Sequence, residues 1–462
     1  MVSAESEQLE INHADSLEIL DDRLVLDGNV SVSTAGAERY TVLTKKLIAY
    51  KDGSGEYNRV ECFERSEIVS KDYSLKADKV FFNKNPQTQN FSLVDATGNV
   101  DIKSFDGKRK IQAPKALIDT DQKMLFAKGG VKSQEFDPKN EKSKKITIVS
   151  EEQDISLQNG PVDSEPNSKK SSTKTSPKIL AADKLSKQME ARGQVVTTLE
   201  AEADVKSEKA EFFTLNGKNE KAVFSGNAYF VKPDGTRGEG KVINYFPNSE
   251  DLQILAFDDK PAQITKTDGT AISGEQVNYN TFSKTTLVQK LSSTGFRSFL
   301  AVPYSDSNPS LEASDKPIAK STMNVWADFI ENKVQNENES TLTAHQNTDE
   351  ELVEVQYGAK RGWGRNLFVF QNKAVPEKKA DFLILAEKAR MVDVLNKQVL
   401  EAPVIRIGLG TKDLSAGFTS RARGSLPLKK KSSTENTSQK SQSKRVQKVI
   451  SKAKTTSETS KY

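Results

Sequence analysis

The residue types that most often catalyse reactions or bind metals are scarce in this chain. Its 462 residues include one cysteine, Cys62, and two histidines, His13 and His345. A single cysteine excludes an intrachain disulfide, and this set does not supply the ligands of a typical Cys/His zinc site. No Gly-x-Ser-x-Gly, Walker-type or Gly-x-Gly-x-x-Gly motif is evident, and the acidic residues fall on predicted turns and exposed strand faces. We therefore expect no enzymatic activity, no cofactor and no metal.

The spacing that does recur places a glycine at the centre of an alternating segment. Examples are DGNVSV (27–32), DATGNVDI (95–102) and SGNAYF (225–230). Because side chains at i and i+2 lie on the same face of a strand, we expect each glycine to share the inward face with its apolar neighbours. Either a β-bulge or sheet corner that sets curvature, or space for a bound acyl chain, would explain them. The glycines with this pattern are Gly28, Gly98, Gly129, Gly193 and Gly226.

A second motif, small-x-x-apolar-x-apolar, follows each glycine segment after a turn. It appears as ADKVFF (77–82), APKALI (113–118), GKVINY (240–245) and GEQVNY (274–279). Asp-Gly pairs, which favour hairpin turns, lie between the motifs. The two motifs recur about every 34 residues, a period typical of a stacked array rather than of separate globules. The sequence therefore predicts an all-β, elongated protein with disordered linkers and a disordered tail.

Changes in composition predict the domain boundaries. We expect modules of alternating strands separated by polar stretches, with one weak strand at 146–150 inside the first stretch. The predicted parts are a first module (1–136), a polar linker (137–178), a second module (179–300), a mostly linker segment (301–350), a divergent third module (351–425) and a basic disordered tail (426–462).

The overall charge and hydropathy exclude some classes of protein. The formal net charge is +4, nearly balanced, so it does not favour binding to nucleic acid. No stretch of about 18 apolar residues is present that could span a membrane as a helix. The start, MVSAESEQLE, lacks the basic and apolar regions of a secretory signal. Two expectations stay open: a cytosolic protein, or a chain that begins after a removed leader.

The two motifs together resemble the OstA-like family, which includes the lipopolysaccharide-transport proteins LptA and LptC and the N-terminal domain of LptD. The resemblance lies in ATGNVDIKSFDGKRKIQAPKALIDTDQKMLFAKGGV (96–131) and SGNAYFVKPDGTRGEGKVINYFPNSEDLQ (225–253). It is looser in 316–408, where DFLILAEKA (381–389) replaces the glycine segment. The resemblance implies an open β-jellyroll of two facing sheets with an apolar interior. A chain this long would hold two or three module equivalents.

The resemblance also implies a function. It implies a non-enzymatic carrier of lipopolysaccharide or a related glycolipid across the periplasm to the outer membrane, with the acyl chains held in the jellyroll groove. Implied partners are the lipid, other jellyroll transport components at the inner and outer membranes, and further copies of the chain added edge to edge; no nucleic acid is implied. The implied location is the periplasm, in association with the outer membrane.

The apolar stripe of the strands is the candidate lipid groove. Ordinary core packing is the other explanation for each residue taken singly. The competing function is a structural β-solenoid, a surface or envelope scaffold without lipid cargo, in which repetition serves length and stiffness. The basic tail is either a solvated end or a contact for anionic lipid headgroups. The groove candidates are Leu24, Leu26, Val30, Val32, Val94, Val100, Ile102, Ile111, Val131, Phe224, Phe230, Ile243 and Val277.

Overall fold

All the elements of this computed structural model are strands. The chain divides into two units, Met1–Arg423, which we call the body, and Gly424–Tyr462. Of the predicted tail, 426–462, no residue is described. The structure describes residues 8–35, 40–88, 90–104, 107–136, 146–157, 185–199, 202–215, 218–304, 321–336, 339–348, 351–372, 381–395, 397–409, 414–417 and 423–425.

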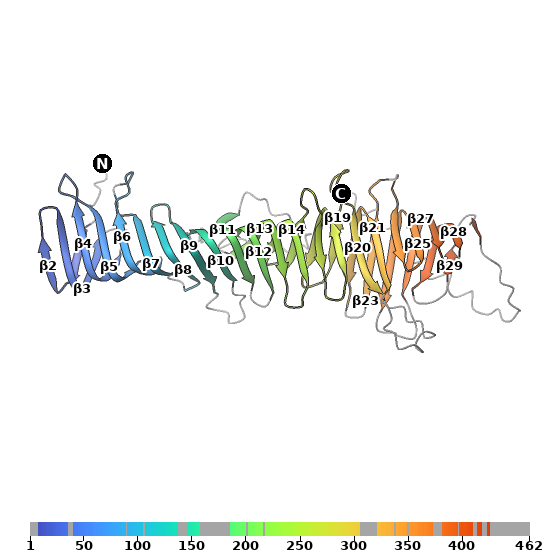
Figure 1. The fold of residues 1–462 in the computed structure, drawn as a ribbon, viewed down its shortest axis with the longest axis horizontal. Coiled ribbons are helices and arrows are strands. Elements are labelled where there is room, and N and C mark those ends of the chain that lie inside the picture. The colour runs from blue at the N-terminus through green and yellow to red at the C-terminus, as the bar shows by residue number, and fades with distance from the viewer. Residues whose placement is uncertain are drawn as a thin grey trace, which may run out of the picture. The chain divides into compact units, whose positions relative to one another are not determined.

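In the first part of the body, consecutive strands pair antiparallel in chain order from β3 to β14 (Figure 1). Most of them are 10 to 14 residues long, and buried and exposed positions alternate along them as the sequence pattern predicts. These strands are β1 (Gln8–His13), β2 (Ser16–Ile19), β3 (Arg23–Ala35), β4 (Thr41–Lys51), β5 (Tyr57–Val69), β6 (Tyr73–Asn83), β7 (Leu93–Ser104), β8 (Arg109–Asp119), β9 (Met124–Glu135), β10 (Ile146–Ser156), β11 (Ser186–Leu199), β12 (Ala203–Leu215), β13 (Lys218–Val231) and β14 (Arg237–Phe246).

Each long strand has a corner near its midpoint, where the register shifts and the strand turns. In β3 the shift lies between Asp27 and Val30, so the strand contributes 23–27 to one sheet and 30–35 to another. We call the sheet containing 30–35 arm A and the sheet containing 23–27 arm B. Every neighbouring strand likewise has one segment in each arm. The body is thus one hydrogen-bonded ladder folded along its length into two facing arms.

Two alternating corner types explain the two sequence motifs. Strands that run from arm B to arm A turn at a pair of residues with positive φ, such as Gly98 (+76°) and Asn99 (+48°) in β7. Strands that run from arm A to arm B turn without such a pair, and their inward residues are three apart across the corner, as with Ala77 and Val80 in β6. This spacing is the small-x-x-apolar motif.

The two corner types fit together through a carboxylate. The Cβ that an alanine would add at Gly98 falls 2.5 Å from Oδ2 of Asp78, on the neighbouring strand, so only glycine leaves room for this acid. The Asn99 side chain donates a hydrogen bond to the same oxygen (2.9 Å). The same arrangement joins Gly28 and Asn29 to Asp15, and Gly226 and Asn227 to Glu208. In these three corners the carboxylate therefore holds the turn from outside.

In the second part of the body the long strands are replaced by pairs of short ones. β14 pairs with β16 through 237–239 in arm A and with β15 through 242–246 in arm B. Arm A continues through β16 (Ala262–Thr265), β17 (Ala271–Gly274), β20 (Ser298–Tyr304), β21 (Ser321–Ala327), β24 (Val353–Tyr357) and β25 (Lys360–Gly364). Arm B continues through β15 (Asp251–Leu255), β18 (Gln276–Asn280), β19 (Thr286–Gln289), β22 (Phe329–Val334), β23 (Glu339–His345) and β26 (Asn366–Asn372).

The arms rejoin in β27, which again crosses both of them. Its segment 382–386 pairs with β26 and its segment 390–393 pairs with β25. Corners with acidic residues persist in the part with short strands: the Glu275 carboxylate accepts hydrogen bonds from the backbone N–H of Leu291 (2.7 Å) and Ser292 (3.0 Å). The remaining strands are β27 (Phe382–Asp393), β28 (Gln398–Gly408), β29 (Leu414–Gly417) and β30 (Arg423–Ser425).

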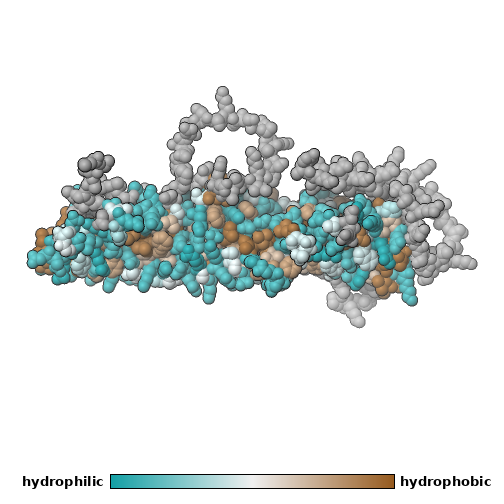
Figure 2. Space-filling view, turned by 90° about the horizontal axis from the view of Figure 1, so that it is seen from above, coloured by the Kyte–Doolittle hydropathy of each residue, from teal (hydrophilic) through white to brown (hydrophobic). Residues whose placement is uncertain are grey.

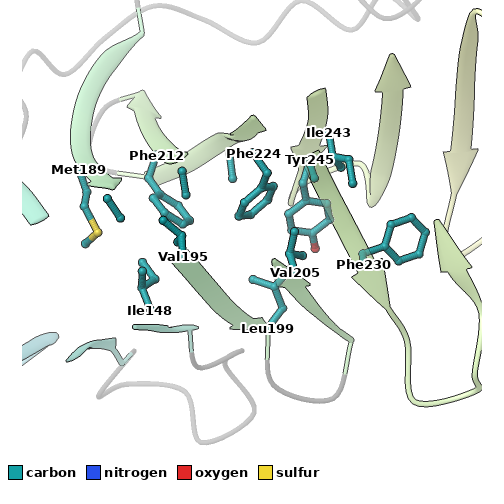
Figure 3. Packing of buried hydrophobic residues seen from close by; sticks show 14 of the residues in the cluster. Ile148, Met189, Val195, Leu199, Val205, Phe212, Phe224, Phe230, Ile243 and Tyr245 are labelled. Carbon is teal, nitrogen blue, oxygen red and sulfur yellow. The ribbon is translucent and has the colours of Figure 1, made fainter. Parts of the chain in front are cut away.

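The apolar core lies between the arms and runs along the body. Figure 3 shows two facing rows of side chains, with Met189, Phe212 and Phe224 from arm B opposite Ile148 and others from arm A. The predicted elongated, all-β jellyroll is confirmed: the strands follow one another along the long axis of the body (Figure 1).

Two of the predicted linkers contain strands. The weak strand predicted at 146–150 is confirmed and is longer than predicted: residues 146–156 form β10, which pairs with β9 and β11 and buries Ile148 and Ile155. The prediction that 301–350 is mostly linker is wrong, since this segment contributes β21, β22 and β23 and most of β20. Polar outward residues lower the apparent hydrophobicity of these later strands. Residues 137–145, 158–178 and 305–320 lie outside the described residues.

The corner acid should make Gly98 intolerant of a side chain. We expect Gly98→Ala to destabilise the body by more than Gly107→Ala, because both positions have positive φ (+76° and +70°) but only the first would clash. The left-handed backbone alone costs about 1 kcal/mol. Hydrogen exchange of the β6, β7 and β8 amides measures the difference, since an array of this kind opens locally. Equal effects of the two substitutions would contradict the role of the acid.

Candidate functional site: the interior between the arms

All thirteen predicted groove residues point into the interior. Their exposed fractions lie between 0% and 5%, and they belong to one continuous apolar cluster. The inward orientation predicted from alternation is therefore confirmed for Leu24, Val100, Phe230 and the rest. In this structure they are covered by the protein itself, which is what core packing also predicts.

The predicted inward orientation of the five glycines is wrong. Each has positive φ and lies at a corner, and the position of a Cβ on four of them falls against an outward acidic side chain. At Gly129 the neighbour is Pro114 instead. The alternation was misleading for a geometric reason. The apolar residues two before and two after the glycine both point inward, as in an ordinary strand, but the turn at the corner points the glycine itself outward. Their role is the bulge and curvature, not space for a ligand.

In the described part of the chain, side-chain contacts close the edge of the interior opposite the corners, and we call this edge the mouth. It lies where the strand ends of arm A approach those of arm B. The ring of Tyr40, from arm A, meets the ring of Phe82, from arm B, edge-on at 6.2 Å. Farther along, the Asn219 amide of arm B donates a hydrogen bond to Glu135 of arm A (3.1 Å). No backbone pairing between strands joins the arms at these two places in the described part of the chain.

A cavity of about 180 Å³ lies at the mouth beside Tyr245. The Tyr245 hydroxyl, from arm B, donates a hydrogen bond to the Glu202 carboxylate at the tip of arm A (2.6 Å). Burial, together with this bond to an anion, raises the pKa of the tyrosine well above its usual range. Phe230 and Leu252 form part of the apolar wall. Tyr245 therefore bridges the arms over an apolar space.

A second, more polar cavity of about 110 Å³ lies farther along the mouth. Lys266 and Asp268 of arm A face Asn332 and Glu339 of arm B across it, with Met323 among its apolar walls. Burial lowers the pKa of Lys266. Sequence reasoning did not identify these mouth residues, because polar side chains at strand ends are indistinguishable by pattern from ordinary turn residues.

The cysteine and the two histidines lie in surroundings that do not suggest a catalytic role. Cys62 is fully buried, and burial raises its thiol pKa to about 12, so it is not a thiolate at neutral pH. The exposed His13 lies 3.3 Å from Asp15, and His345 stacks on Phe329. Among the described residues, no group of three His, Cys, Asp or Glu side chains is placed to hold a metal ion. The residues that the structure describes also include no helix with the length and hydropathy to cross a membrane.

The N-terminal end of the body exposes part of the interior face. Leu17 and Ile19 of β2 pair with Leu26 and Leu24 of β3, yet they are 51% and 66% exposed, because no further strand among the described residues covers them. Ile11 of β1 is also exposed. Figure 2 shows hydrophobic residues at this end of the body, and patches of them along it among hydrophilic ones.

Removal of the Tyr245 hydroxyl should loosen the mouth. We expect Tyr245→Phe to weaken the closed state by about 1 kcal/mol, the usual contribution of one hydrogen bond. Amides of 203–206, in arm A beside Glu202, should then exchange faster with deuterated solvent, whereas corner amides should not change. Tyr229→Phe, on the outward face of β13, is the matched control. Unchanged exchange in Tyr245→Phe would mean that the hydroxyl does not hold the arms together.

Comparisons with known proteins return little. No family model matches the chain, and no curated protein matches it. Among solved structures, the chain is similar to LptH of Pseudomonas aeruginosa, described as the LptA-homologous periplasmic component of a lipopolysaccharide transport device. The match has 18% sequence identity and a TM-score of 0.20, and it covers 25% of this chain and 78% of that one.

Proposed function

We propose that the protein is a non-enzymatic carrier of lipopolysaccharide or a related glycolipid, and that it holds the acyl chains between its two arms. In this proposal it acts in the periplasm and passes lipid toward the outer membrane. The observation that carries the proposal is the asymmetry of the interior. In the part with long strands, one edge is closed by backbone that turns from one arm to the other, and the opposite edge is closed by side-chain contacts at the mouth.

Energetics favour lipid entry through the mouth. Each hydrogen bond across it contributes about 1 kcal/mol, and only a few neighbouring contacts must break for the arms to part locally. Parting exposes apolar side chains, but an acyl chain that enters covers them again. Each methylene buried in this way contributes about 0.8 kcal/mol, so a chain of ordinary length offsets the lost contacts. Binding of this kind requires apolar area and no catalytic group.

The exposed N-terminal end supports the proposed partners. Leu17 and Ile19 continue the inward face of the core beyond its last strand, and the outer edge of β2 has no neighbour among the described strands. Such an end fits another jellyroll that adds strands edge to edge. We propose that the partners are jellyroll transport components at the two membranes, or further copies of this chain.

The alternative is a structural scaffold without lipid cargo. Its support is that the protein's own side chains cover the groove candidates, which are at most 5% exposed. Both proposals predict a stiff array of strands, but only the carrier predicts that inward residues touch lipid.

Site-specific photocrosslinking separates the two. A photoreactive amino acid is placed at the inward positions Ile102, Phe230 or Val277, and the full chain is incubated with lipopolysaccharide before irradiation. We expect crosslinked lipid at these positions. The matched controls are the outward neighbours Asp101, Tyr229 and Asn278, at which no crosslinked lipid is expected. Equal crosslinking at inward and outward positions, or none at either, would contradict the carrier and favour the scaffold.

A further inference from the structure

Two hairpins at the tip of arm A share the sequence Lys-x-Asp-Gly-Thr. The first is KPDGT (232–236), between β13 and β14, and the second is KTDGT (266–270), between β16 and β17. In each, the lysine N–H donates to the carbonyl of the threonine, at 2.8 Å and 2.9 Å. The two turns are adjacent: a Cβ on Gly235 would fall 2.5 Å from the Thr267 methyl group. The repeat therefore places two equivalent lysines next to each other.

Both lysines reach across the mouth to one aromatic ring. The Nζ atoms of Lys232 and Lys266 lie 5.7 Å and 5.1 Å from the ring centroid of Tyr279, which is buried in β18 of arm B. A third lysine, Lys284, follows β18 at the tip of arm B and is close enough to act electrostatically on Lys266 and Asp234. Two cations of arm A therefore lie over one ring of arm B, and Lys284 of arm B is near them.

Two carboxylates, Asp234 and Asp268, lie near the lysines and interact electrostatically with Lys266. Asp234 and Asp268 each accept a hydrogen bond from a backbone N–H of their own turn, those of Thr236 and Thr270, both at 2.8 Å. None of the three lysines forms an ion pair with a carboxylate of the described residues. Lys266 is also partly buried, which disfavours its charge, and burial lowers its pKa. Three lysines against two carboxylates leave a net positive charge at this point, so an anion would be attracted there and would compensate for the burial of Lys266.

This point lies between the two mouth cavities. Lys232 lines the apolar cavity with Phe230 and Leu252, and Lys266 lines the polar cavity with Thr270 and Asn332. A ligand with an anionic group at the lysines could therefore place an apolar part in the first cavity and hydroxyl groups in the second. An amphiphile with an anionic, hydroxyl-bearing headgroup has this arrangement.

We propose that Lys232, Lys266 and Lys284 form a binding subsite for a phosphate or carboxylate group of the carried amphiphile. The subsite fixes the position of the headgroup at the mouth while the acyl chains enter the interior. It rests on the proposed carrier function, since it assigns the headgroup of that same ligand. A free phosphate offers the same chemistry without the tails, and the experiment distinguishes the two sources.

The test compares ligands with and without phosphate on the full-length protein. Lipid A, the acylated and phosphorylated part of lipopolysaccharide, and the same lipid after dephosphorylation are titrated into wild type and into Lys232→Gln/Lys266→Gln. We expect the double substitution to weaken binding of lipid A about tenfold or more, as for loss of charge-assisted hydrogen bonds. Binding of the dephosphorylated lipid should not change, and the loss should shrink at high salt. Lys221→Gln removes a lysine that lies over Phe246 in the same way (5.7 Å), away from the mouth cavities, and should have no effect.

The outcomes separate this proposal from the carrier function. The subsite proposal is wrong if wild type binds both lipids equally tightly, or if Lys221→Gln weakens binding as much as the double substitution does. The three lysines would then only cover Tyr279, and the proposed carrier function would be unaffected. If wild type binds neither lipid, the carrier proposal fails. In that case, titration of pyrophosphate at low salt into wild type and the double substitution tests the subsite by itself. Weak binding that the double substitution abolishes supports a site for free phosphate, and absence of binding by wild type overturns it.

Discussion

The turn that every long strand makes from one arm to the other is the constraint on which the body depends. A flat ladder of alternating strands would leave its apolar face in water, and the corners fold that face onto itself. The turn uses left-handed backbone in every second strand, and in most glycine corners a carboxylate from the neighbouring strand holds it, as in Gly98, Asn99 and Asp78. Because corners follow one another along the ladder, the fold line is continuous, and the opposite edge is left to side chains.

The fold line also decides where space for a ligand lies. Both cavities lie at the mouth, the edge opposite the corners. The two arms are joined there by side-chain contacts, such as the bond between Tyr245 and Glu202. The polar and charged groups of the strand ends lie at the same edge, where a headgroup would lie.

Much of the fold could be predicted from the sequence, because both corner types leave a periodic trace. The alternation identified the thirteen inward residues, and the spacing from Ala77 to Val80 identified the second motif. Two features could not be predicted. Glu64 and Arg65 form a corner with positive φ without any glycine, so composition gives no signal there. The contact between Asp78 and Gly98 joins two strands, and a pattern within one strand does not show it.

The alternation of corner types has a consequence for how such a chain can change in length. Corners with a positive-φ pair alternate with corners of three-residue spacing, and each long strand bonds only to the strands next to it. Insertion or deletion of one strand would bring two corners of the same type together and reverse the direction of every later strand. Insertion or deletion of a strand pair would preserve both. The interior can therefore lengthen or shorten only by whole hairpins. The period of about 34 residues found in the sequence corresponds to one such hairpin, that is, two long strands and the turns that join them.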